Sequence, residues 1–177
     1  LPPEPQRRRA LPSGFPPGFD LAGAAAGWGM EEKLTENALG DLIKWSLVDF
    51  LPSTTSDGGR YRLHDLARDF AGSRLDDAAR YSASLYHAKH YRKVLSLSNE
   101  IFMQGKEVLK GLQLFDQEKA NILAGQSWAM KNLDARSSAA IDLCESYPNG
   151  AYILGLRLTP GERIAWLNTA VQACKLS

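Results

Sequence analysis

The residues best suited to chemistry are a histidine and an aspartate, His64 and Asp65, which stand where the sequence changes period. Before them, residues 60–63 (RYRL) alternate polar and apolar, which is typical of a half-buried strand. After them, apolar residues recur three and four apart up to Ala71, as on one face of a helix. The start of a helix offers N–H groups and partial positive charge to an anion, and an imidazole there can donate a hydrogen bond to a phosphate. The pair also has a purely structural interpretation, because an aspartate stabilises the first turn of a helix.

Other patterns that could support catalysis or metal binding are incomplete. A phosphate-binding loop needs a lysine followed by Ser or Thr, whereas Lys106 in QGKEV is followed by Glu107. His87 and His90 could reach one metal ion, but a structural site usually has four ligands, so we interpret both as helix-surface histidines. We find no plausible nucleophile constellation, and therefore expect no metal site and no self-contained enzymatic activity.

Composition limits the classes of protein that the chain can belong to. Its 177 residues are 44% hydrophobic and 23% charged, which is ordinary for a soluble globular protein of one domain or two small ones. The net charge of +1 indicates neither nucleic acid nor an anionic membrane as partner, and no apolar run approaches the roughly 20 residues that span a bilayer. Two cysteines, Cys144 and Cys174, make no disulfide framework and favour a cytoplasmic location. Because the chain begins at Leu1 rather than methionine, we expect a fragment of a longer protein.

Residues 1–75 have the element order of a winged-helix domain. Asp20 is placed to cap a helix of small residues, because aspartate accepts hydrogen bonds from the first-turn N–H groups. Val48 and Phe50 favour extended backbone, and a Ser/Thr/Asp/Gly loop follows them. The expected elements are a turn over residues 16–20, helices over 21–29 and 32–46, a β-hairpin of strands 47–51 and 60–63, and a helix over 64–75.

Residues 76–177 are predicted to be helical throughout. An apolar stripe from Tyr81 to Leu95 indicates a long helix, Gly105 interrupts it, and the pattern resumes at Val108, Leu109, Leu112 and Phe115. Asp116 and Asp134 are predicted to cap two further helices. The chain therefore reads as mainly α with one small β-hairpin, a winged-helix domain followed by an irregular helical bundle that leads toward a helical-repeat solenoid.

The last helix has the clearest start signal. The sequence TPGE places Thr159 at the cap, Pro160 in the first turn and Glu162 three residues after the cap, which is a capping box. Ile164, Leu167, Val171 and Cys174 then share one face, which we predict to be buried against a neighbour. Cys174 would accordingly be a small core residue rather than a reactive thiol.

Three runs within residues 11–75 resemble the winged-helix region of NB-ARC proteins, which are signal-transduction ATPases with numerous domains. The runs are FPPGFDLAGAAAGWG, LGDLIKWSLVDFLP and GRYRLHDLARDFAGSRL. In that family the winged helix closes over the nucleotide-binding domain and holds the ADP-bound off state. A Met-His-Asp motif lies at this strand-to-helix junction, and its histidine contacts the β-phosphate of ADP. Here the motif reads Leu63-His64-Asp65, so the resemblance implies that His64 is the ADP contact and that Asp65 helps to hold the domain interface.

The helical half is similar to the segment that precedes tetratricopeptide repeats in bacterial members of the family, through the runs LFDQEKANILAGQSWA and YILGLRLTPGERIAWL. The resemblance implies two intramolecular partners, a nucleotide-binding domain and a helical-repeat sensor domain, together with protein partners and oligomerisation of the activated protein. It implies ADP or ATP as a ligand of the whole protein. This chain lacks Walker motifs, so alone it should bind no cofactor and hydrolyse no ATP.

Two alternatives stay open. A winged helix can bind DNA, as in transcriptional regulators with a helical partner-binding domain, but a recognition helix needs basic residues toward the phosphates. The helix predicted over residues 32–46 carries Glu32, Glu36 and Asp41 against only two lysines. The other alternative is a helical scaffold that binds protein partners and has no nucleotide role.

Overall fold

The computed structural model describes residues 16, 18–52, 58–73, 75–134 and 137–177, and is mainly helical with a small antiparallel sheet. It divides into two compact units, and we call the part that ends at His87 the N-terminal unit and the part that begins at Ala88 the C-terminal unit. The division falls inside the long helix α4 (Asp77–Met103). The predicted fold class, mainly α with a small β-hairpin, is confirmed at this level.

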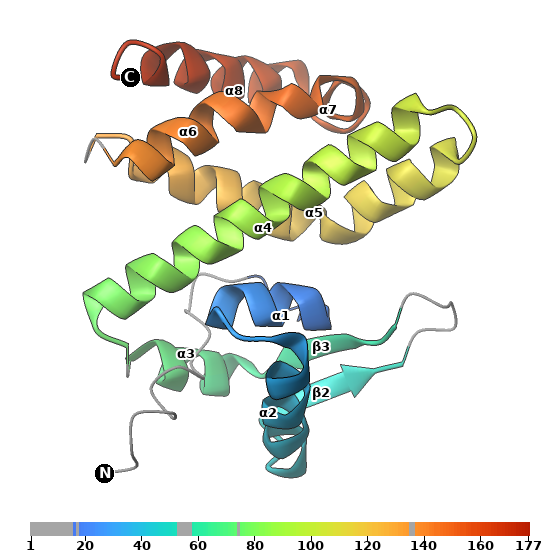
Figure 1. Ribbon diagram of the computed structural model, residues 1–177, viewed down its shortest axis with the longest axis vertical. Helices are drawn as coiled ribbons and strands as arrows, with labels where there is room; N and C mark the ends of the chain where they lie inside the picture. Colours follow the sequence, from blue (N-terminus) through green and yellow to red (C-terminus); the bar gives the residue numbers. More distant parts are fainter. Residues whose placement is uncertain (1–15, 17, 53–57, 74, 135–136) are drawn as a thin grey trace. The chain divides into compact units, whose positions relative to one another are not determined.

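The N-terminal unit combines three strands with short helices. The predicted hairpin is confirmed: β2 (Val48–Leu51) pairs antiparallel with β3 (Arg60–Leu63), with Val48 opposite Leu63 and Asp49 opposite Arg62. The middle of the predicted hairpin loop, residues 53–57, lies outside the described residues. The turn predicted over residues 16–20 is partly wrong, because β1 (Gly18–Phe19) adds a third strand on the other edge of β3. Figure 1 shows the hairpin beside the helices α1 (Leu21–Trp28), α2 (Glu32–Lys44) and α3 (Asp65–Ser73).

Local signals explain both ends of α1. The Asp20 carboxylate accepts a hydrogen bond from the Gly23 amide at 2.6 Å, which confirms the predicted cap. The helix ends at Gly29, whose φ of 61° lies in the left-handed region that glycine adopts without strain.

The core of the N-terminal unit is built from all of its β-strands and its first two helices. Leu63 of β3 and Val48 of β2 are buried on the same side of the hairpin, because they face each other across the ladder. Burying them fixes the strand register, since a slip by one residue would turn both side chains to solvent. The buried apolar residues of this core are Phe19, Ala24, Trp28, Ala38, Leu39, Val48 and Leu63.

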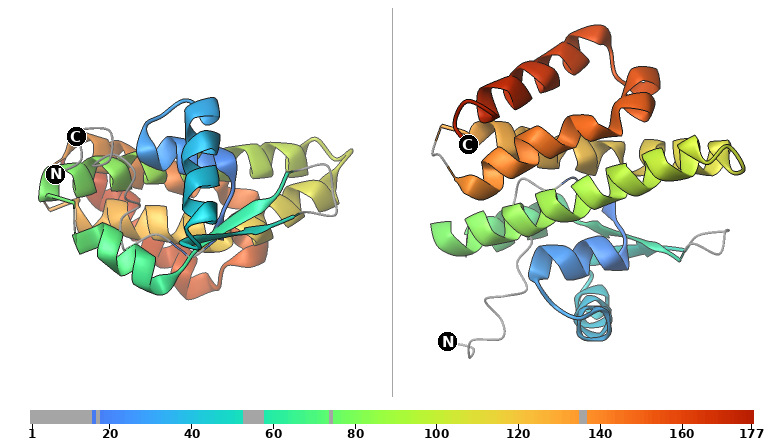
Figure 2. Two further views of the ribbon diagram at one scale, coloured as in Figure 1. Left: turned by 90° about the horizontal axis from the view of Figure 1, so that it is seen from below. Right: turned by 45° about the horizontal axis from the view of Figure 1, so that its top comes forward.

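The C-terminal unit is entirely helical in its described residues. The predicted break at Gly105 is confirmed, and the chain reverses there with a φ of 75°. After the end of α4 come α5 (Val108–Lys131), α6 (Ser138–Ser146), the 3-10 turn η2 (Tyr147–Gly150), α7 (Ala151–Arg157) and α8 (Pro160–Ala173). Helices α6 and α8 are packed against each other, and the right view of Figure 2 shows them as the orange and red helices.

Small residues let the helices of the C-terminal unit approach closely. A Cβ added at Gly125 of α5 would lie 2.2 Å from the Tyr147 hydroxyl oxygen, so the tyrosine occupies the space above that glycine. The buried Tyr147 hydroxyl donates a hydrogen bond to the Ala88 carbonyl oxygen at 2.8 Å, which satisfies a polar group that would otherwise be costly to bury. Burial raises the pKa of Tyr147 far above its ordinary value, so it remains neutral.

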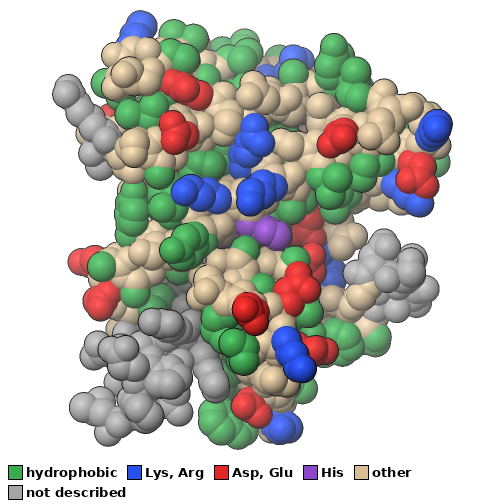
Figure 3. Space-filling view, viewed as in Figure 1, with side chains coloured by type: hydrophobic (Ala, Val, Ile, Leu, Met, Phe, Trp, Pro, Cys, Tyr) green, Lys and Arg blue, Asp and Glu red, His purple; other side chains and the backbone are tan. Residues whose placement is uncertain are grey.

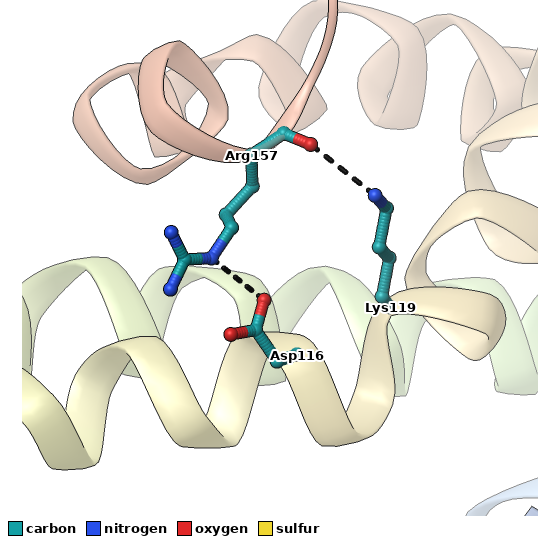
Figure 4. A network of polar contacts seen from close by, with 3 residues as sticks. All are labelled: Asp116, Lys119 and Arg157. Carbon is teal, nitrogen blue, oxygen red and sulfur yellow. Dashed lines mark hydrogen bonds and ion pairs between the residues drawn. The ribbon is translucent and has the colours of Figure 1, made fainter.

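The predicted caps at Asp116 and Asp134 are wrong. Asp116 lies inside α5, and its carboxylate accepts a hydrogen bond from Arg157 Nε at 2.7 Å (Figure 4). The ammonium group of Lys119 donates to the Arg157 carbonyl oxygen at 3.2 Å, so these contacts join α5 to the end of α7. Asp134 precedes α6, but the residue at the cap position of that helix is Ser137.

For the last helix, the predicted start is confirmed and the predicted buried face is wrong. Thr159 and Glu162 form the predicted capping box at the start of α8. The buried side chains of α8 are Trp166, Thr169 and Ala173, which point to α6 and η2. The predicted core face is exposed instead: Ile164 is 58%, Leu167 52% and Val171 56% accessible, and Cys174 is also exposed.

The upstream apolar stripe shows a similar split. Ala88, Tyr91, Leu95 and Phe115 are buried as predicted, whereas Leu109, assigned to the same stripe, is 72% exposed.

Within the described residues, no helix is both long enough and apolar enough to cross a membrane.

Candidate functional site

The backbone at the strand-to-helix junction is fixed on both sides of His64. Leu63, the residue before it, is buried in the core of the N-terminal unit. The His64 amide donates to the Leu47 carbonyl oxygen at 3.2 Å, which extends the hairpin pairing by one contact. The His64 carbonyl oxygen accepts from the Arg68 amide at 2.9 Å, which is the first bond of α3. His64 is therefore held at the junction that its sequence position predicts.

The side chain of His64 points to a residue that the sequence analysis did not select. His64 Nε2 lies 3.3 Å from Asp49 Oδ1, and both side chains are about half exposed, at 48% and 50%. Asp49 is opposite Arg62 in the ladder, so His64, two residues beyond Arg62, is its diagonal neighbour. The strand register could have suggested this pair, because diagonal neighbours in an antiparallel hairpin are within reach of long or aromatic side chains.

Asp65 has a different partner from His64. It is the first residue of α3, is 76% exposed, and forms an ion pair with Arg68 at 2.9 Å between Oδ1 and a guanidinium nitrogen. Exposed ion pairs of this kind contribute little to stability, so the pair mainly orients both side chains on the first turn of α3. Arg68 is only 22% exposed, and its buried Nε has no hydrogen-bond partner in the described part of the chain. The predicted role of Asp65 at a domain interface stays a prediction.

An aromatic group supports the hairpin next to the junction. Tyr61 of β3 stacks on Phe19 with ring centroids 6.0 Å apart and packs against Phe50 at 5.1 Å. Burial, and to a smaller degree the Glu36 carboxylate, raise the pKa of Tyr61, so it remains a neutral phenol. It can stiffen the hairpin but offers no negative charge to a ligand.

The geometry of the pair determines what His64 can do. His64 Nε2 and Asp49 Oδ1 form an ion pair only when the ring is protonated, and a neutral imidazole has one N–H donor. A phosphate accepts hydrogen bonds, so it would need an N–H on the ring nitrogen that faces it. Anion binding at the junction stays a prediction.

The described residues offer little other chemistry. No group of three or more His, Cys, Asp or Glu side chains among them could hold a metal ion. The interpretation of His87 as a surface histidine is wrong, since it is buried at 4% exposure, and the His90 ring packs edge-on against Tyr91 at 4.8 Å.

Burial raises the pKa of the Cys144 thiol to about 11, which keeps it protonated at neutral pH. Partial desolvation, then the Glu145 carboxylate, raise the pKa of the exposed Cys174 thiol as well.

Comparisons of the chain with models of known families, with curated proteins and with solved structures give no match. The resemblance to NB-ARC proteins therefore stays a prediction from the motif and runs given above.

Proposed function

We propose that this chain is the regulatory part of an NB-ARC-type signal-transduction ATPase. In this proposal the N-terminal unit is its winged-helix domain, which closes over a nucleotide-binding domain elsewhere in the longer protein. The C-terminal unit links it to a helical-repeat sensor domain. The ligand of the closed state is ADP, and His64 binds its β-phosphate.

The observation that carries the proposal is the placement of the Leu63-His64-Asp65 motif. Leu63 is buried, whereas the His64 imidazole remains half exposed beside the first turn of α3. The backbone bonds from His64 to Leu47 and Arg68 fix the main chain from which that imidazole projects. A contact that joins two domains needs an exposed side chain on a fixed main chain, because ordering a mobile segment would cost part of the binding energy.

Asp49 has a definite part in the proposal. Its carboxylate stands 3.3 Å from His64 Nε2 and is the anion that the imidazole contacts when no phosphate is present. Two carboxylate or phosphate groups on one imidazole are favourable when the ring is an imidazolium, because both of its nitrogens then donate.

The experiment that tests the proposal is the rate of ADP release from the longer protein, measured with a fluorescent ADP analogue in stopped flow. One charge-assisted hydrogen bond contributes about 1–3 kcal/mol, so His64→Ala should speed release by about tenfold to a hundredfold. Lys44→Ala is the control, because it removes a 76% exposed charge from the same unit and should leave release unchanged. Equal release rates for wild type and His64→Ala would remove the nucleotide role.

The DNA-binding alternative has less support from the described residues. In a winged-helix interpretation the helix before the hairpin, α2, would be the recognition helix, and Glu32 and Glu36 are exposed on it. Lys44 lies 3.3 Å from Asp41, so a carboxylate stands beside one of the two lysines. An acidic helix would repel the DNA backbone.

A further inference from the structure

The helix α4 carries a cluster of three basic side chains, Lys89, Arg92 and Lys93, in the part that belongs to the C-terminal unit. Arg92 and Lys93 follow Lys89 by three and four positions, so the three side chains are neighbours on the helix surface. Lys89 and Lys93 are exposed, and Arg92 is half-buried. We call these three residues the α4 cluster. Figure 3 shows Lys and Arg side chains gathered over α4 near the middle of the view.

The charge of the α4 cluster is not neutralised within the part of the chain that the structure describes. Along α4, the acidic side chains that come next in either direction are Asp77 at its start and Glu100 near its end. None of the three cluster residues forms an ion pair or a side-chain hydrogen bond with a described residue. Like charges at this spacing repel one another, so the cluster weakens the helix unless an anion lies beside it.

The acidic side chains of the C-terminal unit do not supply that anion. Five of them lie beside other groups: Glu107 beside Lys110, Asp116 beside Arg157, Glu118 beside Asn121, Glu145 beside Cys174 and Glu162 beside Thr159. The other three, Glu100, Asp134 and Asp142, form no ion pair with the α4 cluster. The anion that fits the cluster therefore comes from another molecule.

Arg92 gives the α4 cluster a restrained anchor. Burial raises the pKa of Tyr147, and the charge of Arg92 opposes that rise, so the guanidinium lies near the Tyr147 phenol. A half-buried guanidinium has fewer conformations to lose on binding than an exposed lysine side chain. It can also bind one carboxylate through two parallel hydrogen bonds.

The residues that follow the α4 cluster along the helix decide which kind of anion fits. Leu97 comes four positions after Lys93 and is 51% exposed, and Glu100 is exposed three positions later. A long polyanion lying along α4, such as a strand of nucleic acid, would meet this apolar side chain and then a carboxylate that repels it. A short acidic peptide segment with an apolar side chain beside its carboxylates is complementary to the cluster and to Leu97.

We propose that the α4 cluster and Leu97 bind a short acidic segment of another protein. Two carboxylates of that segment pair with the three basic side chains, and an apolar side chain next to them covers Leu97. Lys89 and Lys93 are about 6 Å apart along the helix, a spacing that acidic residues four apart in a helix reproduce. The inference does not depend on a nucleotide role for His64, which belongs to the other unit.

The test measures binding of synthetic peptides of equal length to this chain by fluorescence anisotropy at low salt. The first peptide has two glutamates four positions apart with a leucine beside them, the second has lysines in place of the glutamates, and the third has serine in place of the leucine. The first should bind at least about tenfold more tightly than the second, and added salt should reduce the difference. It should also bind more tightly than the third peptide and than a single-stranded oligonucleotide of the same net charge.

Three results would overturn the proposal. They are equal affinity for the first two peptides, no binding of the first peptide, and tighter binding of the oligonucleotide than of the first peptide. Equal affinity for the first and third peptides would remove Leu97 from the site.

Two double variants of equal charge connect the binding to the α4 cluster. Lys89→Glu with Lys93→Glu should reverse the preference, so that the basic peptide binds more tightly than the acidic one. Lys106→Glu with Lys131→Glu makes the same change of net charge at two other exposed lysines of the C-terminal unit and should keep the preference for the acidic peptide. If both double variants act alike, the binding reflects net charge and the site is wrong.

A single variant and a measurement of association complete the test. Leu97→Ser should lower the affinity for the first peptide to that for the third, and circular dichroism checks that each variant is folded. If sedimentation shows that the chain associates with itself and Lys89→Glu with Lys93→Glu abolishes this, the acidic segment belongs to a second copy and the proposed partner is wrong.

Discussion

Replacing Gly111 by alanine tests the packing of α4 against α5. Gly111 lies in the second turn of α5, and an added Cβ would be 2.7 Å from both the Ser98 carbonyl oxygen and the Phe102 amide nitrogen. Ordinary contact begins at 3.4 Å, so the two helices would have to separate by about 0.7 Å. Both neighbouring atoms belong to the α4 backbone, and no change of rotamer can relieve the contact.

Two opposing terms decide the size of the effect. Alanine in place of glycine inside a helix gains about 1 kcal/mol, and overpacking a rigid contact costs about 1–3 kcal/mol. Because the contact is between backbones, we place the cost near the upper end, and Gly111→Ala should destabilise the C-terminal unit by about 1–2 kcal/mol. Gly155→Ala is the matched control, since its nearest neighbour is the flexible end of Arg163 at 3.6 Å and it should stabilise by up to about 1 kcal/mol.

The assay is thermal and urea unfolding followed by circular dichroism at the helical band. For a unit of this size each kcal/mol corresponds to about 4–8 °C in Tm. The two variants should therefore shift Tm in opposite directions. If Gly111→Ala raises Tm as much as Gly155→Ala does, the close approach of α4 and α5 at this glycine is wrong.

Three other predictions address the ends of α8, the cysteines and the nucleotide. Hydrogen bonds from Thr159 lower the pKa of Glu162, so its stabilising effect is present at neutral pH and is lost as the pH falls through the folded-state value. Glu162→Gln should lower Tm at neutral pH, and the difference from wild type should vanish well below the ordinary pKa of 4.5; a difference that persists in acid would contradict the capping box. A thiol reagent at mildly alkaline pH should modify the exposed Cys174 before the buried Cys144, and mass spectrometry showing the reverse would refute the assigned burial. Calorimetry should find that ADP binds this chain alone with millimolar affinity or weaker, about −4 kcal/mol, because a few hydrogen bonds at one junction make a weak site; micromolar binding would show a site that the present account lacks.

Local signals in the sequence were sufficient for the starts of α1 and α8 and for the hairpin. Asp20 and Thr159 accept hydrogen bonds from residues only three positions away, so their effect depends on no distant part of the chain. The strands of the hairpin are neighbours in sequence, and the turn formers between them limit how they can pair. The short strand β1 was missed because two residues carry no periodicity, and only pairing with β3 makes them a strand.

The errors come from information that periodicity does not contain. Both faces of α8 are apolar, and spacing cannot tell which of them a neighbour covers; the larger Trp166 side chain is the one that α6 and η2 bury. The predicted cap at Asp116 is wrong because the arginine that pairs with it, Arg157, is far along the chain. At the candidate site, the position of His64 was predictable from the change of period, whereas its pairing with Asp49 required the register of the hairpin.

The central claim is that His64 binds the β-phosphate of ADP, and phosphorus NMR of the longer protein with bound ADP tests it most directly. The β-phosphorus resonance of bound ADP should differ between wild type and His64→Ala, because removing a charge-assisted hydrogen bond changes the electron density at that phosphate. The α-phosphorus resonance should be nearly the same in both proteins. A β-phosphorus resonance that is identical in wild type and His64→Ala would contradict the claim and leave His64 as a structural residue at the start of α3.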